Sequence, residues 1–169
     1  MLVVLSVSVW ASGAEGFRFE SAGARFGFGV SPVTHNFHQA EAVVMWTLPA
    51  GWDLGREWRL QTLLEASAGW LGDPGGNGFI GTLGPSLSLG RARLPVSIEA
   101  GLAPTFLSTH EFGTKDFGAL LQFTSQVGLD LDLGRHFRFS YRFQHMSNGG
   151  FSSPNPGLNL NVVGLSYRF

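Results

Sequence analysis

The sequence predicts an all-β fold, an eight-stranded antiparallel transmembrane β-barrel. Three observations lead to this prediction. Apolar and polar residues alternate with a period of two along most of the chain, turn-forming residues separate the alternating stretches, and the last residue is aromatic. A two-residue period places successive side chains on opposite faces of a strand. No helix of useful length shows an apolar stripe with a period of 3.6 residues.

Eight stretches of the chain carry the strand pattern. It is clearest between residues 117 and 133, where Phe117, Leu121 and Leu129 share one parity and mostly polar residues take the other. Turn-rich segments such as SPVTHN, GDPGGNG and NGGFSSPNPG separate the stretches. The expected strands cover about residues 17–30, 37–48, 57–71, 78–90, 95–107, 117–133, 136–147 and 158–169.

One continuous apolar face and one polar face admit two architectures. A soluble barrel or sandwich, such as a lipocalin-like binder, would turn the apolar face inward, whereas a transmembrane barrel turns it toward lipid. Several strands reach the ~9–11 residues that a tilted strand needs to cross a bilayer, which favours the transmembrane barrel. The polar parity then supplies side chains for the lumen: Glu41, Arg59, Glu65, Glu99, Gln122 and Arg142.

The two ends of the chain favour an exported protein. The run MLVVLSVSVW, followed by small residues, is typical of a signal peptide cleaved after Ala14, and a short buried strand is the alternative. The missing basic segment before this run is consistent with a truncated start. The chain ends on Phe169, which resembles the C-terminal signature of bacterial outer-membrane barrels. We therefore expect a signal peptide over 1–14, one barrel domain over 15–169, and a location in the bacterial outer membrane.

Composition excludes some classes of function. The chain has 11 basic and 12 acidic residues, so no basic field indicates nucleic-acid binding. It has no cysteine, so disulfides do not stabilise it. His35 and His38 have a spacing seen in metal ligands, but no further ligand clusters with them in the sequence. We expect neither a metal nor a cofactor.

The segment HMSNGGFSSPNPGLN, residues 145–159, places polar residues on an apolar strand face. His145 and Ser147 continue the parity of Tyr141 and Phe143. Side chains at positions i and i+2 of a strand lie roughly 7 Å apart, and an imidazole can cover that gap to accept a serine proton. This pair is a candidate nucleophile and general base.

The last strand and the preceding loop supply further candidates. Asn159 shares the parity of Phe169, so it points outward beside the strand of His145, and an amide can orient an imidazole. No Asp or Glu occurs after Asp132. The candidate oxyanion donors are the loop residues Asn148, Gly149, Gly150 and Asn155. Ordinary interfacial polar residues and ordinary turns are the alternative interpretation of the same pattern.

The segment QHMSNGGFSSPNPGLN resembles the signature of the PagL-type lipid A 3-O-deacylases, eight-stranded outer-membrane enzymes, and SIEAGLAPTF is similar to a central strand of that family. The resemblance implies that Ser147 is the nucleophile and His145 the general base. It further implies that Asn155 and the amides around Gly149 and Gly150 stabilise the oxyanion. The best-known members have a glutamate as the third member of the triad, and Asn159 occupies that position here.

The resemblance also implies a substrate and partners. We expect a serine esterase that hydrolyses the ester-linked 3-O acyl chain of lipid A in the outer leaflet. The expected partners are lipid A or lipopolysaccharide, membrane lipids and the barrel-assembly machinery, with a homodimer left open and no nucleic acid. A non-catalytic outer-membrane barrel with a structural or adhesive function is the alternative.

Overall fold

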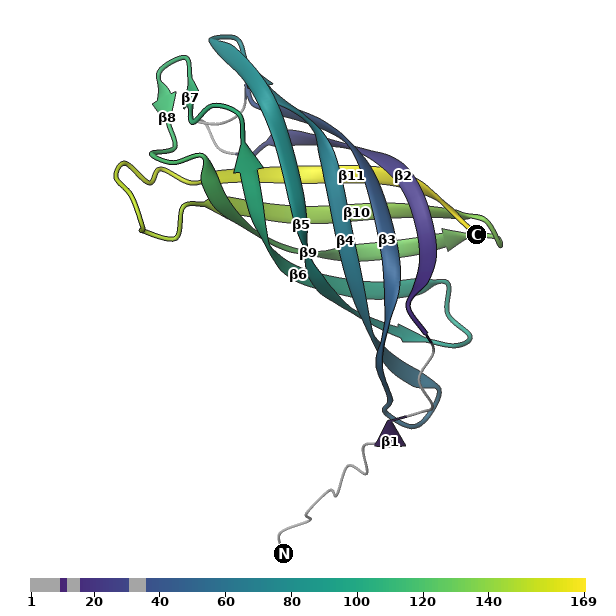
Figure 1. Ribbon diagram of the computed structural model, residues 1–169. Coiled ribbons are helices and arrows are strands. Elements are labelled where there is room, and N and C mark those ends of the chain that lie inside the picture. Colours follow the sequence, from purple (N-terminus) through teal and green to yellow (C-terminus); the bar gives the residue numbers. More distant parts are fainter. Residues whose placement is uncertain (1–9, 12–15, 31–35) are drawn as a thin grey trace, which may run out of the picture.

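The chain folds into a closed barrel of eight antiparallel strands (Figure 1). The computed structural model describes residues 10–11, 16–30 and 36–169. Strand β11 pairs with β2, and β3 pairs with β4, so the sheet closes on itself. The wall consists of β2 (Arg18–Gly29), β3 (His38–Asp53), β4 (Trp58–Asp73), β5 (Gly76–Arg91), β6 (Val96–Leu107), β9 (Leu121–Leu133), β10 (Phe137–Ser147) and β11 (Leu158–Arg168).

Three short strands accompany the wall. Strand β1 (Trp10–Ala11) pairs with the end of β3, and β7 (Glu111–Phe112) pairs with β8 (Lys115–Asp116) in the loop between β6 and β9. The predicted signal peptide over 1–14 lies outside the described residues apart from β1, and it stays a prediction. In the described part of the chain, no helix is long and apolar enough to cross a membrane.

The eight expected strands are confirmed, with differences at two of their ends. Strand β3 runs to Asp53 instead of ending at about residue 48, past an irregularity in the register between Thr47 and Gly51. The second difference is the start of β9. We expected this strand to begin at Phe117 and to place that side chain on the lipid face. It begins at Leu121 instead, and Phe117 is buried. The reason is an aromatic cluster, because the ring of Phe117 packs edge-on against Phe37 and Phe112 with centroids 5.7–5.8 Å apart.

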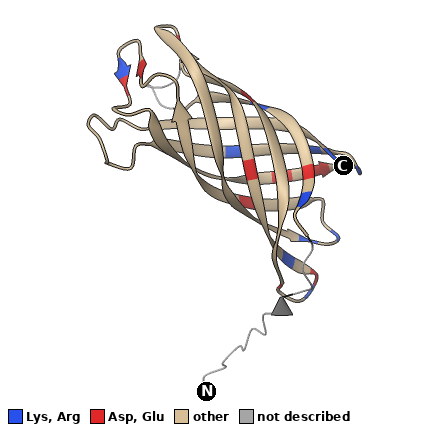
Figure 2. Ribbon diagram, viewed as in Figure 1, with Lys and Arg blue, Asp and Glu red and all other residues tan. Residues whose placement is uncertain are grey.

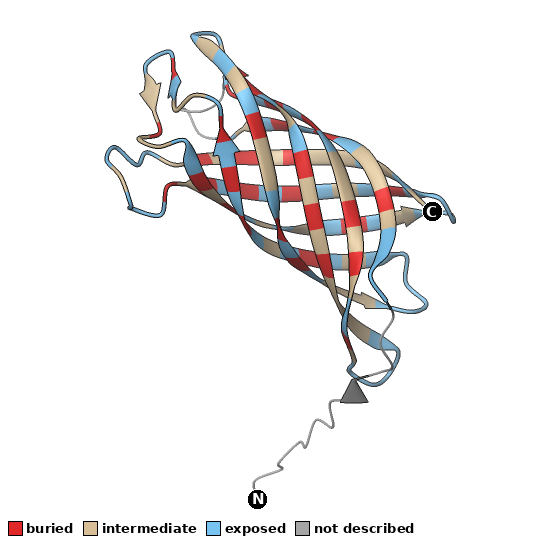
Figure 3. Cartoon of the chain, in the orientation of Figure 1, coloured by how far each residue is buried: buried red, intermediate tan, exposed pale blue. Residues whose placement is uncertain are grey.

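Buried and exposed residues alternate along the strands of the wall (Figure 3). The exposed residues are mostly apolar and many of the buried ones are polar, as the transmembrane prediction requires. Apolar side chains on the outer wall of β9 and β10, such as Leu129 and Phe139, are 50% and 40% exposed. Of the six residues expected in the lumen, Arg59 is half-buried. The other five are buried: Glu41, Glu65, Glu99, Gln122 and Arg142.

Two arginines organise the polar lumen. Arg25 contacts Glu41 and Glu65, each at 2.6 Å, and donates a further hydrogen bond to Ser67. Arg142 pairs with Glu99 at 3.0 Å and with Asp130 at 2.8 Å. Charges taken out of water must be paired to be tolerated, so each arginine compensates two carboxylates. Figure 2 shows charged residues in the middle of the barrel and toward the C-terminal end of the molecule.

The opposite end of the barrel is closed by apolar side chains, which the sequence pattern did not predict. Loop residues and inward-facing strand residues meet there, and Lys115 lies over the Phe117 ring at 5.5 Å. The loops at this end of the barrel contribute side chains to this cluster. Its members are Phe37, Leu71, Ile80, Leu107, Phe112, Phe117, Met146, Leu158, Leu160 and Val162.

The Arg25 pairs give a stability prediction. Arg25→Ala leaves Glu41 and Glu65 buried without their counter-charge, so we expect the free energy of unfolding to fall by about 3–5 kcal/mol. Urea titration of the protein refolded into phospholipid vesicles, followed by tryptophan fluorescence, measures this. The control is Arg93→Ala, because the Arg93 side chain is 83% exposed beside Glu57 and its loss should be small. Equal stabilities for the two variants would contradict the role given to Arg25.

Candidate active site

The candidate residues lie at the loop end of β10 and β11, on the outer wall. Cross-strand pairing places His145 opposite Asn159 on one side and opposite Ser125 on the other. Ser147 is the last residue of β10, and the intervening Met146 points inward and is buried. The predicted parity therefore holds, and His145, Ser147 and Asn159 share one face.

A hydrogen bond joins His145 to Asn159. Their Nδ1 and Oδ1 atoms are 2.7 Å apart. Because a carbonyl oxygen only accepts, Nδ1 carries the proton in this arrangement and Nε2 is left with a free lone pair. This is the tautomer that a general base for a serine requires.

Gly157 lies beside the other edge of the imidazole. A Cβ atom at this glycine would lie 3.0 Å from Cε1 and 3.8 Å from Nε2 of His145. Gly157 directly precedes Leu158, the partner of Met146, so it lies at the level of Ser147. The Nε2 edge therefore faces the end of the strand that carries the serine. In the described part of the chain no hydrogen bond joins Ser147 to His145, and such contacts commonly tighten only when substrate binds.

Asn148 holds the loop that follows the serine. Its side chain is 1% exposed, and its amide nitrogen lies 3.0 Å from each of three backbone carbonyl oxygens, those of Phe117, Ser152 and Pro154. Its Oδ1 atom accepts a hydrogen bond from the Gly150 N–H at 2.9 Å. The side chain thus connects the loop after β10 to the loop before β9.

Of the four predicted oxyanion residues, two keep a donor available. The N–H of Gly150 and the side chain of Asn148 are used within the loop. The Asn155 Oδ1 atom accepts from the backbone N–H of Asn148 at 3.1 Å, which turns the Asn155 amide nitrogen away from this contact. Among the described residues, that amide nitrogen and the Gly149 N–H have no hydrogen-bond partner.

An aromatic pair borders the serine on the β9 side. Phe123 lies opposite Ser147 in the strand register, and its ring centroid is 5.9 Å from that of Phe151. Phe151 is 84% exposed, so it presents a large apolar surface at the rim of the barrel. Sequence reasoning missed this pair and Gly157. The register that brings them to the serine is set by strand pairing rather than by spacing along the chain.

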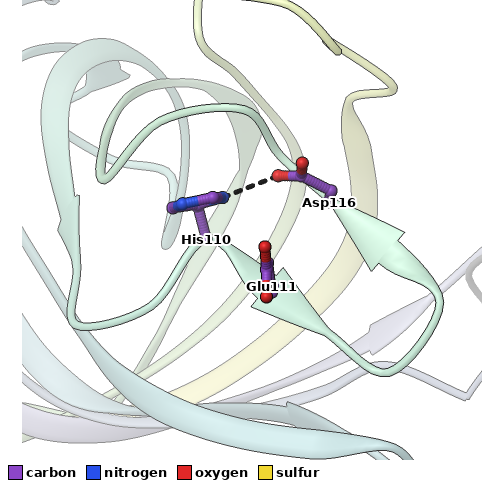
Figure 4. A group of neighbouring side chains, drawn as sticks. All are labelled: His110, Glu111 and Asp116. Atoms are coloured by element: carbon purple, nitrogen blue, oxygen red, sulfur yellow. Dashed lines mark hydrogen bonds and ion pairs between the residues drawn. The ribbon is translucent and has the colours of Figure 1, made fainter.

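The other histidines do not join this site. His38 stacks against Phe26, and His35 lies outside the described residues. His110, Glu111 and Asp116 form a separate group on the β7–β8 hairpin, with ligand atoms within 4.8 Å of one another (Figure 4). Hydrogen bonds from His110 and from the Gly118 N–H lower the pKa of Asp116. The 2.6 Å contact between His110 and Asp116 joins the start of the hairpin to its end.

Comparison with known proteins agrees with this geometry. The sequence pattern of the family described as "Lipid A 3-O-deacylase (PagL)" matches residues 38–168. The chain belongs to this family. The matched range contains every candidate residue named above and excludes only β1 and β2 from the strands.

Individual relatives agree with the assignment. The chain is 38% identical to "Lipid A deacylase PagL" of Bordetella bronchiseptica over 72 residues, which cover 43% of this chain and 40% of that protein. The crystal structure of the outer membrane enzyme PagL superimposes with a TM-score of 0.75 at 20% identity, covering 86% of this chain and 97% of that one. Neisserial surface protein A superimposes with a TM-score of 0.54 at 14% identity, covering 94% and 100%. The two structures show the shared barrel fold.

The hydrogen bonds of Asn148 predict that its loss makes the loop after β10 easier to cleave. Asn148→Ala removes the donor for three carbonyls, so we expect residues 148–157 to be cleaved about tenfold faster by an added protease. Limited proteolysis of the refolded protein, read by mass spectrometry, measures the rate. Ser153→Ala is the control, because Ser153 is an exposed residue of the same loop. Wild-type cleavage rates in Asn148→Ala would show that these hydrogen bonds do not hold the loop.

Proposed function

We propose that this protein is a serine esterase of the bacterial outer membrane that hydrolyses the ester-linked 3-O acyl chain of lipid A. The observation that carries the proposal is the His145–Asn159 hydrogen bond beside Ser147 on the outer wall, in a chain of this family. The catalytic residues are then Ser147, His145 and Asn159.

In the first step the Ser147 oxygen attacks the carbonyl carbon of the ester. His145 Nε2 takes the serine proton as the C–O bond to the enzyme forms, because a neutral hydroxyl is a weak nucleophile. The carbonyl oxygen becomes an oxyanion. When the tetrahedral intermediate collapses, the bond to the sugar oxygen breaks and His145 returns the proton to that oxygen. The acyl chain is left on Ser147.

The oxyanion is stabilised by the Gly149 N–H and the amide nitrogen of Asn155. Each has no hydrogen-bond partner among the described residues, unlike the Gly150 N–H and the Asn148 side chain. Donors fixed before the reaction stabilise developing charge without reorganising, and one such donor contributes about 10²–10³ in rate. Asn148 has a different role in this proposal, since it holds the loop in shape and does not touch the substrate.

The second step releases the acyl chain. Water attacks the acyl-enzyme carbonyl, His145 accepts the water proton, and the bond to Ser147 breaks with return of that proton to the serine oxygen. In both steps His145 becomes an imidazolium. Asn159 keeps the ring oriented but carries no negative charge, so it stabilises the imidazolium less than a carboxylate does.

The position of the site suits a lipid substrate. The lumen at the level of the barrel centre is filled by buried ion pairs, and its loop end is closed by the apolar cluster. A lipid in the surrounding membrane reaches the outer wall directly. Insertion by the barrel-assembly machinery and a homodimer remain predictions from the sequence.

The nucleophile has a direct test. Ser147→Ala removes the attacking oxygen, so we expect no loss of acyl mass from lipid A when the variant is expressed in bacteria. Mass spectrometry of extracted lipid A measures this, and heat-modifiable migration in gels checks that the barrel is folded. Ser153→Ala should deacylate like the wild type. Deacylation by Ser147→Ala would exclude this nucleophile, and unchanged lipid A with the wild-type protein would favour a non-catalytic barrel.

The missing carboxylate gives an opposite prediction, a gain of activity. In Asn159→Glu a carboxylate accepts from His145 Nδ1 and stabilises the imidazolium, so we expect kcat to rise about 10- to 100-fold. Asn159→Leu removes the acceptor and should lower kcat by a similar factor. Initial rates with purified lipid A in detergent micelles measure both. If Asn159→Leu retained the wild-type rate, Asn159 would have no part in orienting His145.

A further inference from the structure

A hollow lies on the outer wall, away from His145, Ser147 and Asn159. It measures about 390 Å³ and spans β4, β5, β6 and the start of β9. Its floor is made by two small residues, Ala68 and Gly81, which lie opposite each other in the β4–β5 register. Large apolar side chains that are about half exposed stand around it: Phe79, Leu83, Phe106 and Leu121.

The wall beneath this hollow has an interrupted hydrogen-bond ladder. Strands β5 and β6 pair at Thr82 with Thr105, and the pairing resumes only at Ser86 with Gly101. Pro104 and Pro85 lie in this interval, and proline has no N–H to donate. Prolines are rare in strands paired on both sides, and unmade backbone hydrogen bonds are costly in lipid. Pro104 also lines the hollow, so the interruption and the hollow coincide.

One side of the hollow lies in the same cross-strand row as the serine. Phe106 pairs with Leu121, Pro104 with Phe123, and Phe123 with Ser147. The side of the hollow at Pro104 is therefore two strands from Ser147, which corresponds to about 10 Å across the wall. The Phe123–Phe151 pair stands between the two as a ridge.

We propose that this hollow, which we call the β5–β6 groove, holds a second acyl chain of the lipid A molecule whose ester lies at Ser147. The proposal rests on the proposed function. Lipid A carries several acyl chains on one head group, and a chain that leaves a head group fixed at Ser147 can cross the ridge into the groove. The chain undergoing hydrolysis then lies on the β10–β11 side of the ridge, past His145.

The benefit of such a groove is orientation. Surrounding lipid is as apolar as the wall, so the groove gains little from the hydrophobic effect and binds through van der Waals packing. Holding a second chain restricts rotation of the head group in the membrane plane, and this keeps the ester carbonyl at Ser147. Restricted orientation of this kind lowers the activation barrier.

The test fills the groove without touching the lumen. Ala68 points outward, so Ala68→Phe places a ring on the groove floor, and Phe106→Ala removes one wall without adding bulk. Ala100→Phe is the matched control, because Ala100 also points outward on β6 but lies outside the groove. For each purified variant, kcat/KM is measured in detergent micelles with multiply acylated lipid A and with a single-chain p-nitrophenyl ester.

We expect the ratio of kcat/KM for lipid A to that for the single-chain ester to fall about tenfold in Ala68→Phe, and to fall in Phe106→Ala. Ala100→Phe should keep the wild-type ratio. A wild-type ratio in both groove variants would overturn the proposal, as would an equal fall in Ala100→Phe. Loss of a dimer in Ala68→Phe with an unchanged ratio would also overturn it and assign the groove to contact between copies. The proposed function fails separately, if Ser147→Ala hydrolyses both substrates like the wild type.

Discussion

Arg25 and Arg142 lie in the lumen, and each is paired with two buried carboxylates. These ion pairs occupy the middle of the space that a narrow eight-stranded barrel encloses. Their geometry depends on every neighbouring strand keeping its register, because a slip by one residue would turn the charges toward lipid. The same register places the opposite parity on the outer wall. The polar lumen and the outward position of His145, Ser147 and Asn159 are therefore consequences of one arrangement.

Polar side chains on a lipid-facing wall need one another as hydrogen-bond partners, because lipid offers none. Two cross-strand pairs on β10 and β11 do so: His145 with Asn159, and the Tyr141 hydroxyl with Asn161 at 2.8 Å. In each pair an asparagine oxygen accepts the hydrogen bond. A neutral amide is less costly than a carboxylate next to hydrocarbon, since an ionised group loses far more solvation there. An asparagine at position 159 therefore lowers the cost of exposing this side chain to lipid, and it lacks the negative charge that a carboxylate would bring to the proposed triad.

The features that could be predicted from the sequence are those that follow from the two-residue alternation of apolar and polar side chains. The eight strands, the lumen residues and the shared face of His145 and Ser147 all follow from alternation along the chain. The period fails at Phe117, because a loop aromatic continues the pattern of the strand that follows it but packs into the apolar cluster. A two-residue period carries no information about where a strand begins. Where a strand begins depends on which loop side chains are buried, as Phe117 is in the apolar cluster.

Contacts between distant segments could not be predicted in this way. The sequence predicts Asn148 as a donor to the oxyanion, but its side-chain amide is buried and donates to backbone carbonyls of two loops. The position of Gly157 beside the imidazole depends on the register of β10 and β11. The floor of the β5–β6 groove arises because Ala68 of β4 lies opposite Gly81 of β5. A single sequence contains these residues but not their pairing.

The Asn148 side chain joins two loops that are about thirty positions apart in the sequence, and Ser152 adds a second link by donating to the Gly118 carbonyl at 2.7 Å. The loop before β9 and the loop after β10 therefore share one hydrogen-bonded framework. Neither loop has its own complete set of backbone partners. A chimaera that exchanges only one of the two loops for that of another family member would therefore lose hydrogen bonds that the other loop needs.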